Sequence, residues 1–456
     1  MFRPWQGTHL LYTGIGDKMG TKLDRIRELA VGNPGMKFTA LYHHINKELL
    51  LECHKEISGN KAVGVDRVTK SEYEVNLEEN LTALVERLKR KNYRPSPSLR
   101  VNIEEIKGKI RPLGISAYED KIVQLALHKV LEAVYEPKFH NSMFGFRQNR
   151  GQHDALRALN QQIEFGKTNF VLDADIRGYF NNMTHERILE LIAHKIGDPN
   201  ILWLIKKILT AGVIEEGKRR PSVRGTEQGN IASPIISNIY MHYALALWFE
   251  IKFKPQCRGE AGLVIFADDF VVTFQYKSDA ENFLKKIKER FTLFGLELHE
   301  TKTRLVEFGR FAKIDREKRG EGKPETFDFL GFTHYCSESK TGKFRVKRKT
   351  SKKKAKAKLQ EVNKWLRENC HLRLKDLFEK LSRKLRGHYQ YYGITDNVKA
   401  ISNHLHKVES YLFKWLNRRS QEKSYTWEGF REMRKIFTLP RPKIHVSIYA
   451  DQFKKI

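Results

Sequence analysis

Two short apolar stretches within residues 262–274 meet at a pair of adjacent aspartates, and this arrangement restricts the fold more than any other part of the chain. Both stretches are rich in β-branched and aromatic residues, and Asp268 and Asp269 lie at their junction. The pattern predicts a β-hairpin with carboxylates at its tip. An Asp-Asp pair is a common surface turn, but carboxylates beside buried strands carry a desolvation cost. A bound divalent cation would remove that cost.

A second β-rich run, residues 170–175, carries acids at alternate positions and is followed by a turn at Gly178. Alternation places Asp173 and Asp175 on the same face of a strand. If one of them lies beside the hairpin tip, three carboxylates are available to hold two Mg²⁺ ions roughly 3.5–4 Å apart. Such a pair of ions activates a 3′-hydroxyl and stabilises a leaving pyrophosphate. The acids therefore predict phosphoryl-transfer chemistry.

The net charge points to a polyanionic partner. With 84 Lys and Arg against 54 Asp and Glu, the charge is +30, which suits a membrane surface or nucleic acid. The most apolar stretch, residues 231–249, is interrupted by Ser233, Pro234 and His242, so no transmembrane helix is predicted. No signal peptide follows Met1, and the four cysteines show no C-x-x-C spacing. Nucleic acid is therefore the expected partner, and the cytoplasm the expected location.

Most of the excess charge lies in the last quarter of the chain. Residues 336–456 carry 32 Lys and Arg against 11 Asp and Glu, and ten of the sixteen residues 343–358 are basic. Such a block is usually a solvated or disordered run, but it is followed by apolar stripes with helical spacing, which predict a small basic bundle. In residues 383–392 cations alternate with aromatics that either stack on unpaired bases or pack in the core. Residues 308–324 predict an exposed loop.

A series of motifs, ordered along nearly the whole chain, resembles the group II intron reverse transcriptase/maturase family. The ordered set is much more specific than any one motif. The motifs are Gly64-Val65-Asp66, residues 108–115 (GKIRPLGI), 119–124 (EDKIVQ), 144–153 (FGFRQNRGQH), 174–180 (ADIRGYF), 225–234 (GTEQGNIASP), 266–269 (FADD), Gly295-Leu296 with Lys302-Thr303, and 329–332 (FLGF).

The resemblance implies an α+β, right-hand polymerase with fingers and a palm, in which an antiparallel palm sheet packs on helices, followed by an α-helical thumb called domain X. Members often end in an H-N-H endonuclease, but only about 30 residues follow the basic bundle, so the short form without this domain is expected. The expected divisions are an N-terminal helical extension (1–60), fingers (61–170), a palm with the polymerase active site (171–335), a basic helical thumb (336–425) and a short tail (426–456).

The resemblance also assigns the acids. Asp175, Asp268 and Asp269 are implied to be the catalytic, metal-binding residues, with the carbonyl of Ile176 as a further ligand. Asp173 is then a neighbour without a catalytic role. The implied cofactors are two Mg²⁺ ions, with Mn²⁺ as a possible substitute.

Four residues are implied to contact the incoming dNTP. Tyr179 is expected under the sugar, where it disfavours a 2′-hydroxyl, although a core tyrosine is the alternative. Arg111 is expected to bind the triphosphate from the fingers, a task that suits a guanidinium, although a surface salt bridge would also explain it. Gln228 is expected beside the nucleotide, and Lys302 is expected to support the nucleotide or donate a proton.

Three further expectations concern neighbouring segments. The helix after Gln228 is expected to be capped by Ser233 and begun by Pro234. The hairpin that holds the primer end is implied to contain Phe329, Leu330 and Gly331. The expected RNA-binding residues are Arg147, Arg150, Lys347, Arg348, Lys349, Lys352, Lys353, Lys354, Arg383, Lys384 and Arg386.

The chain departs from the family pattern at a few positions. Where the family usually has Ile-Pro-Lys before the Gly-Lys-x-Arg segment, this chain has Ile103-Glu104-Glu105, so Glu105 stands in place of the lysine expected to bind the triphosphate. Either Lys107 or Lys109 compensates, or nucleotide binding is weaker or differently arranged. Glu227 and Asn230 replace the usual Pro and Gly around Gln228. Phe266 stands where tyrosine is commoner, which leaves the acids unchanged.

The leading prediction is an RNA-directed DNA polymerase that adds dNTPs to a primer 3′-hydroxyl and binds its parent group II intron RNA to assist splicing and mobility. Its expected partners are that intron RNA, an RNA template with a DNA primer, target DNA and dNTPs, with no membrane. The expected location is the bacterial cytoplasm, with nucleoid association when DNA is bound. Two alternatives stay open: an RNA-binding splicing cofactor with little polymerase activity, and an intron-free reverse transcriptase of host repair or defence.

Overall fold

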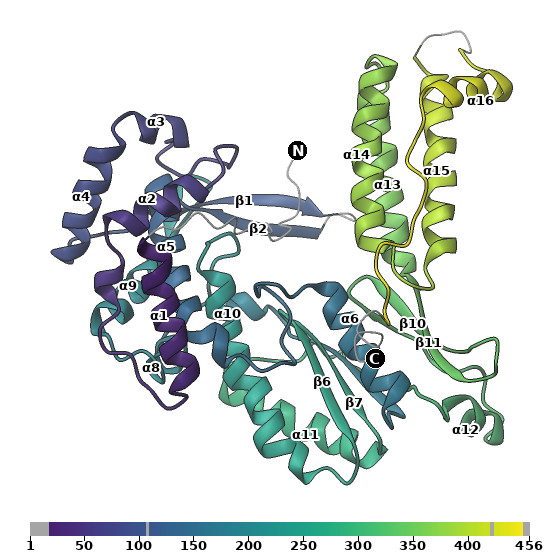
Figure 1. Cartoon of the computed structure of the whole chain (residues 1–456), viewed down its shortest axis with the longest axis horizontal. Coiled ribbons are helices and arrows are strands. Elements are labelled where there is room, and N and C mark those ends of the chain that lie inside the picture. Colours follow the sequence, from purple (N-terminus) through teal and green to yellow (C-terminus); the bar gives the residue numbers. More distant parts are fainter. Residues whose placement is uncertain (1–17, 106–108, 420–423, 450–456) are drawn as a thin grey trace.

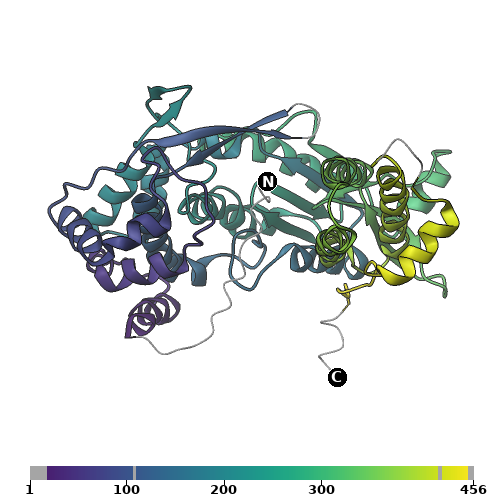
Figure 2. The same cartoon turned by 90° about the horizontal axis from the view of Figure 1, so that it is seen from above.

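The structure is a computed structural model that describes residues 18–105, 109–419 and 424–449. Figure 1 shows three regions side by side: helices with the long β1–β2 hairpin, a central sheet, and an upright bundle built from α13, α14 and α15. Seen from above, the bundle helices stand nearly end-on beside the central region (Figure 2). The predicted α+β class, with a strand-containing polymerase region followed by a helical bundle, is confirmed.

The first region is a helical assembly around α5, which is buried along most of its length because apolar residues occupy all of its sides. Asp198 fixes the N-terminal extension to this assembly, because it caps α9 and also accepts hydrogen bonds from the backbone N–H groups of Leu41 and Tyr42 at 2.7 and 2.8 Å. The helices are α1 (Lys18–Gly32), η1 (Tyr42–His44), α2 (Lys47–Glu56), α3 (Lys70–Val75), α4 (Leu77–Lys89), α5 (Tyr118–Tyr135), η2 (Glu136–Lys138), α8 (His185–Ala193) and α9 (Pro199–Leu209).

The fingers carry a four-stranded sheet in the order β2-β1-β4-β5. β1 and β2 form an antiparallel hairpin in which Ile103 lies opposite Arg111, while β4 adds to β1 in parallel. The strands are β1 (Ser98–Glu105), β2 (Lys109–Ile115), β4 (Val213–Glu215) and β5 (Lys218–Arg220).

The palm sheet has the order β6-β7-β3-β8 with all neighbours antiparallel, as predicted. Helices cover it, and a long buried stretch from α10 through π-helical turns runs beside it. The elements are β3 (Phe170–Asp175), β6 (Ala261–Phe266), β7 (Asp269–Phe274), β8 (Arg304–Glu307), α6 (Gln152–Asn160), η3 (Gln161–Phe165), α7 (Tyr179–Asn182), α10 (Ser233–Met241), η4 (His242–Ala246), η5 (Phe249–Phe253), η6 (Lys254–Gln256) and α11 (Lys277–Leu293).

Two hydrophobic cores meet at the palm sheet, because successive side chains of a strand point to opposite faces. Leu172 and Phe270 belong to the core shared with the fingers and with α11. Val171 and Val271 belong instead to a second core, which continues through α6 into the thumb. The acids of β3 alternate with Leu172 and therefore lie on the face of the second core.

The thumb is built on a three-stranded antiparallel sheet, β11-β10-β9. The three apolar stripes predicted from the sequence form α13, α14 and α15, and a fourth helix, α16, packs against them through Phe430 and Met433. The elements are α12 (Ala312–Lys318), β9 (Phe327–Phe329), β10 (Phe332–Glu338), β11 (Phe344–Thr350), α13 (Lys352–Asn369), α14 (Leu374–Tyr392), α15 (Val398–Leu416) and α16 (Trp427–Ile436).

The structure differs from several expectations about segments. The division expected at residue 336 falls inside β10, and the basic run 343–358 is ordered as β11 and the start of α13. The predicted loop 308–324 contains α12, and its Phe308 is fully buried. The predicted tail contains α16. For the aromatics of residues 383–392 the sequence left two alternatives open, and Tyr389 and Tyr392 follow the second, because both are buried in the core through α14.

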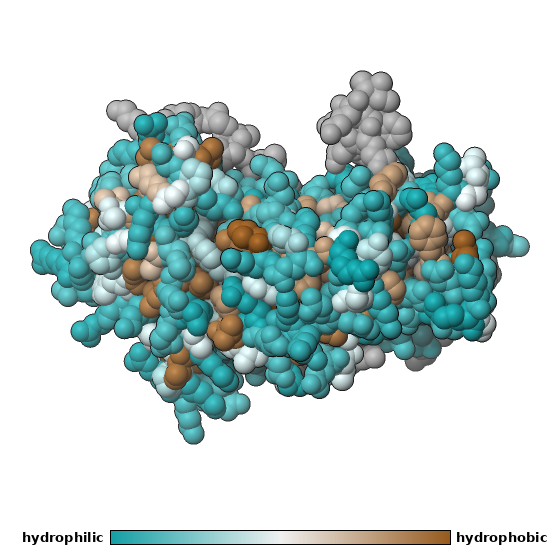
Figure 3. All heavy atoms as spheres, turned by 90° about the horizontal axis from the view of Figure 1, so that it is seen from below, coloured by the Kyte–Doolittle hydropathy of each residue, from teal (hydrophilic) through white to brown (hydrophobic). Residues whose placement is uncertain are grey.

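The face of the molecule seen from below is predominantly polar (Figure 3). Figure 3 shows hydrophobic residues in small, separate groups on a mostly hydrophilic face. None of the helices within the described ranges is both long and apolar enough to cross a membrane.

Candidate active site

Three of the predicted acids meet at one edge of the palm sheet. Asp175 ends β3 and Asp269 begins β7, and the two are direct partners across the sheet. Asp268 lies in the two-residue turn that joins β6 to β7, so the predicted hairpin with carboxylates at its tip is present. Asp173 lies two residues before Asp175, opposite Val271.

The turn that carries Asp268 is held in an unfavourable backbone conformation. Ala267 has a φ of 59°, a left-handed conformation that costs a non-glycine residue about 1–2 kcal/mol. Gly145 lies so close that a Cβ there would be 2.4 Å from the Ala267 nitrogen, and Asn238 Nδ2 donates to the Gly145 carbonyl at 2.9 Å. Sequence reasoning missed these supports, although Gly145 belongs to one of the quoted motifs.

The acids repel one another in a poorly solvated place. Burial, with the neighbouring Asp268 and Asp175 as the next causes, raises the pKa of Asp269 to about 7. Burial raises the pKa of Asp173 to about 7, with Asp269 as the next cause. The pKa of Asp268 is raised mainly by burial as well. A cation at this edge would relieve the repulsion.

Lys302 supplies one such cation, because its ammonium group forms an ion pair with the Asp175 carboxylate. Within the described ranges, no three His, Cys, Asp or Glu side chains converge closely enough to form a ready metal site. The donor set nevertheless fits Mg²⁺, which prefers carboxylate and carbonyl oxygens. The Ile176 carbonyl takes no part in the bridge to Leu298, whose hydrogen bonds are made by Asp175 and Arg177.

Arg111 and Gln228, predicted for nucleotide binding, are brought together from positions 117 residues apart. Arg111 Nε donates to Gln228 Oε1 at 2.9 Å, and the Gln228 carbonyl accepts from the Gly114 N–H at 2.8 Å. Gly229 follows with a φ of 119°, and a Cβ there would lie 2.3 Å from the Gly114 oxygen. Only glycine fits this crossing of loop and strand.

The helix after this loop starts differently from the prediction. The N-cap is Ala232, and Ser233 Oγ donates instead to the Glu227 carbonyl at 2.9 Å. Asn230 Oδ1 accepts from the Ala232 N–H at 2.8 Å in the turn just before the helix, and no side chain of the described residues caps the helix itself. Burial raises the pKa of Glu227. The side chains of Glu104 and Glu105 lie outside the described residues.

The structure contradicts the contact predicted for Tyr179. The Tyr179 side chain is only 2 % exposed, and its hydroxyl donates to the Ser237 carbonyl at 2.6 Å. It is the core tyrosine that the sequence left as the alternative. The next residue, Phe180, is partly exposed, and its carbonyl accepts from the Thr226 N–H at 2.8 Å, beside the Gln228 loop.

The predicted hairpin at residues 329–331 is present between β9 and β10. Leu330 and Gly331 both have positive φ, 48° and 82°, as a tight hairpin turn requires. The thumb holds the turn from two sides: Tyr391 Oη donates to the Leu330 carbonyl, and the Ser351 N–H donates to the Gly331 carbonyl, both at 3.0 Å.

Two arginines predicted to bind RNA are buried instead, which corrects those predictions. Arg147 is 9 % exposed, binds the Glu136 carboxylate at 2.8 Å, and donates to three backbone carbonyls. Arg348 has no exposed surface and donates to Asn160 Oδ1 at 2.5 Å. Neither guanidinium is accessible to a phosphate.

The other predicted RNA-binding residues are at least partly accessible. Arg150 donates to Asn141, and Arg383 pairs with Glu379 at 3.1 Å. Lys349 and Lys384 lie over the rings of aromatic residues. The other accessible side chains of this set are Lys347, Lys352, Lys353, Lys354 and Arg386.

Comparisons with known proteins agree with this geometry. Residues 76–334, more than half of the chain, match the sequence model described as reverse transcriptase (RNA-dependent DNA polymerase), so the chain belongs to the reverse transcriptase family. Residues 352–433, which include α13, α14 and α15, match the group II intron, maturase-specific domain. Together the two matches define a group II intron reverse transcriptase/maturase.

Curated relatives carry corresponding names. The chain is 32% identical over 234 residues to the group II intron-encoded protein LtrA of Lactococcus lactis, which covers 51% of this chain and 39% of that protein. It is 33% identical over 220 residues to the protein YkfC of Escherichia coli, covering 47% and 58% of the two chains. It is 28% identical over 140 residues to nuclear intron maturase 4 of Arabidopsis thaliana, covering 30% and 17%. The matches thus span between about a sixth and three fifths of these relatives.

Proposed function

We propose that this protein is an RNA-directed DNA polymerase that also binds the RNA of a parent group II intron. The observation that carries the proposal is the meeting of Asp175, Asp268 and Asp269 at one sheet edge, within a chain of the reverse transcriptase family. Desolvation and the neighbouring carboxylates raise the pKa values of Asp268 and Asp269, and such clustered acids have no structural use without a cation. In a polymerase, bound divalent cations would neutralise these acids.

Two Mg²⁺ ions would be held by these carboxylates, with the Ile176 carbonyl as a further ligand. When bound, the ions would activate the primer 3′-hydroxyl and stabilise the leaving pyrophosphate. In their absence Lys302 neutralises Asp175. Release of its ammonium group on metal binding would place a donor beside the leaving group.

The nucleotide is proposed to bind between Arg111 and the loop at Gln228. The guanidinium would contact the triphosphate, while its Nε–H bond to Gln228 orients both side chains. We assign the position under the sugar to Phe180 rather than Tyr179, because Phe180 is the accessible one of the two aromatic residues. The hairpin 329–331 would hold the primer end.

Primer extension tests the proposal directly. The wild-type protein with Mg²⁺ is expected to extend a DNA primer on an RNA template. Asp268→Asn keeps the size of the side chain but removes its charge, so extension should fall about a thousandfold or more. Affinity for RNA should stay within twofold of wild type, or about 0.4 kcal/mol. Asp24→Asn, at an exposed acid of α1, is the matched control and should retain full activity.

The thumb is proposed to bind intron RNA and the template–primer duplex through its exposed cations. The charge of residues 336–456 and the match to the maturase-specific domain support this role. Parent intron RNA should therefore bind more tightly than an unrelated RNA of equal length at the same salt concentration, and splicing of that intron should be faster with the protein than without it.

A second candidate is a splicing cofactor with little polymerase activity. The ion pair of Lys302 with Asp175 favours it, because a lysine satisfies one of the acids without any metal. A wild-type protein that binds intron RNA tightly but adds no nucleotide with Mg²⁺ or Mn²⁺ would establish this alternative.

A further inference from the structure

One face of the palm helix α6, continued by the π-helical turn η3, carries a row of polar side chains toward the thumb. π-helical turns occur often at functional sites. Each side chain in the row contacts a part of the chain beyond residue 340: Tyr391 at the end of α14, Ser447, β11 and Tyr449. The row, at spacings of four, three and four residues, is His153, Arg157, Asn160 and Glu164.

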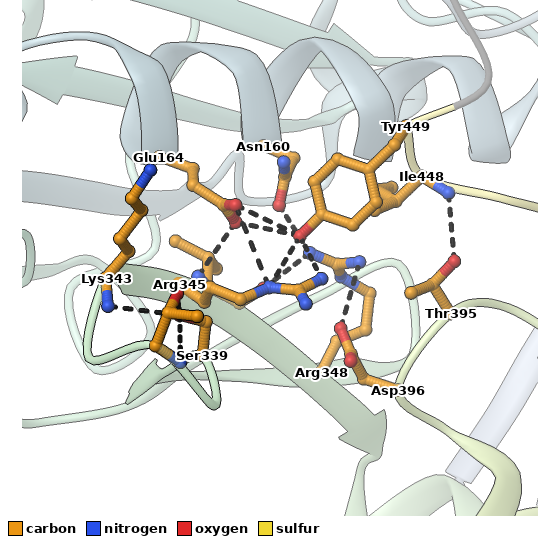
Figure 4. A network of polar contacts seen from close by, with 12 residues as sticks. Asn160, Glu164, Ser339, Lys343, Arg345, Arg348, Thr395, Asp396, Ile448 and Tyr449 are labelled. Atoms are coloured by element: carbon orange, nitrogen blue, oxygen red, sulfur yellow. Dashed lines mark hydrogen bonds and ion pairs between the residues drawn. The ribbon is translucent and has the colours of Figure 1, made fainter. Parts of the chain in front are cut away.

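Glu164 is the centre of the row, with only 7 % of its side chain exposed. Its Oε2 accepts from the Val346 N–H at 3.0 Å, and the Tyr449 hydroxyl donates to the carboxylate at 3.1 Å. The same hydroxyl accepts from Arg345 Nε at 3.1 Å and from Nη2 at 2.5 Å. Tyr449 therefore links a palm carboxylate to a guanidinium of β11 (Figure 4).

A second link lies beside the first. The fully buried Arg348 of β11 donates to Asn160 Oδ1 and to the Val346 carbonyl, and lies 3.8 Å from Asp396 in the turn between α14 and α15. Figure 4 shows both arginines between the palm helix and this turn. Buried charges require such partners in fixed geometry.

Residues 443–449 connect this network to the thumb. The N–H groups of His445 and Val446 both donate to the Gly393 carbonyl, at 2.7 and 3.0 Å, and the Thr395 N–H donates to the Val446 carbonyl at 3.1 Å. The segment is thus fastened to the α14–α15 turn at one end and to the palm at Glu164. It lies outside both matched regions, 76–334 and 352–433.

We propose that Glu164, Arg345 and Tyr449 are positioning residues that set the thumb against the palm and thereby determine the affinity for a template–primer duplex. The inference rests on the proposed polymerase function and states how the thumb is held against the palm. Hydrogen bonds fix direction, whereas apolar contacts allow sliding. Because the thumb also holds the 329–331 hairpin through Tyr391, a rotation at this junction loosens the hold of the thumb and the hairpin on the duplex.

The decisive variant is Tyr449→Phe, which removes the hydroxyl and keeps the ring. Duplex affinity should weaken about tenfold, the change expected when a hydrogen bond to charged groups is lost, and extension products should shorten. At saturating duplex, kcat for the first nucleotide should stay unchanged, because the acids are untouched. Glu164→Gln keeps an acceptor for the Val346 N–H and should therefore lose less duplex affinity than Tyr449→Phe. Tyr276→Phe, at a 41 % exposed tyrosine elsewhere in the palm, is the matched control.

The measurements are fluorescence anisotropy with an RNA–DNA duplex, single-nucleotide kinetics, product length and the thermal midpoint of each variant. Arg345→Met and the double variant with Tyr449→Phe complete a cycle, in which the two effects should not add. Unchanged duplex affinity and product length in Tyr449→Phe would overturn the inference. So would additive effects in the cycle. If the wild type adds no nucleotide, the polymerase proposal fails, while duplex binding still decides the role of Tyr449.

Discussion

The crossing of Gly229 over β2 offers a sharp test of nucleotide positioning. In Gly229→Ala the new Cβ would lie 2.3 Å from the Gly114 oxygen, whereas ordinary contacts begin at 3.4 Å. The loop must therefore retreat by about 1 Å, a displacement that can cost about a hundredfold in rate when it moves a binding group. The retreat would break the bond from the Gly114 N–H to the Gln228 carbonyl and carry Gln228 away from Arg111.

Steady-state primer extension with varied dNTP measures the effect. We expect kcat/KM for dNTP to fall about 10- to 100-fold in Gly229→Ala, with duplex affinity unchanged. Gly217→Ala is the matched control: Gly217 also has a positive φ, 76°, but nothing lies within 4 Å of its added Cβ. Gly217→Ala should carry the backbone strain of a positive φ and still show normal kinetics. If Gly229→Ala retains the wild-type kcat/KM, the loop at Gln228 does not position the nucleotide.

Three further outcomes are expected. Tyr179→Phe should lose about 1 kcal/mol of stability without changing the preference for dNTPs over ribonucleotides, whereas Phe180→Ala should increase ribonucleotide incorporation in a competition assay; the reverse pattern would restore the original prediction. Alanine at all three lysines 352–354 should reduce the slope of log affinity for RNA against log salt by about 2–3, and an unchanged slope would exclude them as phosphate contacts. Burial, with His404 as the next cause, lowers the pKa of His388 to about 3, and burial lowers that of His404 to about 4, so stability present above pH 6.5 is lost as the pH falls. Each histidine should cost about 2 kcal/mol between pH 7 and pH 5. In urea unfolding, His388→Phe should therefore lose about 2 kcal/mol less than the wild type over this pH range.

The hairpin and its acids could be predicted because their signals are local. A two-residue turn between apolar strands fixes where Asp268 and Asp269 lie, and alternation fixes the face of Asp175. The meeting of Arg111 with Gln228 could not be derived from periodicity, because these residues lie 117 positions apart. It followed only from the family motifs.

The errors have a common physical origin in tertiary burial. Arg348 lies in a basic run whose composition is typical of phosphate binding. Asn160 and Asp396, which are distant in the sequence, nevertheless hold its guanidinium inside the protein. Tyr179 and Phe180 are adjacent aromatic residues, and only the packing of α10 decides which one is buried. The sequence signal at position 336 was a change in charge, whereas the chain continues β10 through that position.

The palm sheet separates two hydrophobic cores, and this arrangement limits how the protein can be divided into parts that fold independently. Leu172 faces the interior of the fingers, while Val171, one residue earlier, faces the interior of the thumb. A polymerase region separated from its thumb would uncover part of the side of the sheet that carries Val171 and Val271, the side to which Asp175 also belongs. The two regions therefore cannot be exchanged between relatives as independent modules unless the residues on the thumb side of the sheet are exchanged with them.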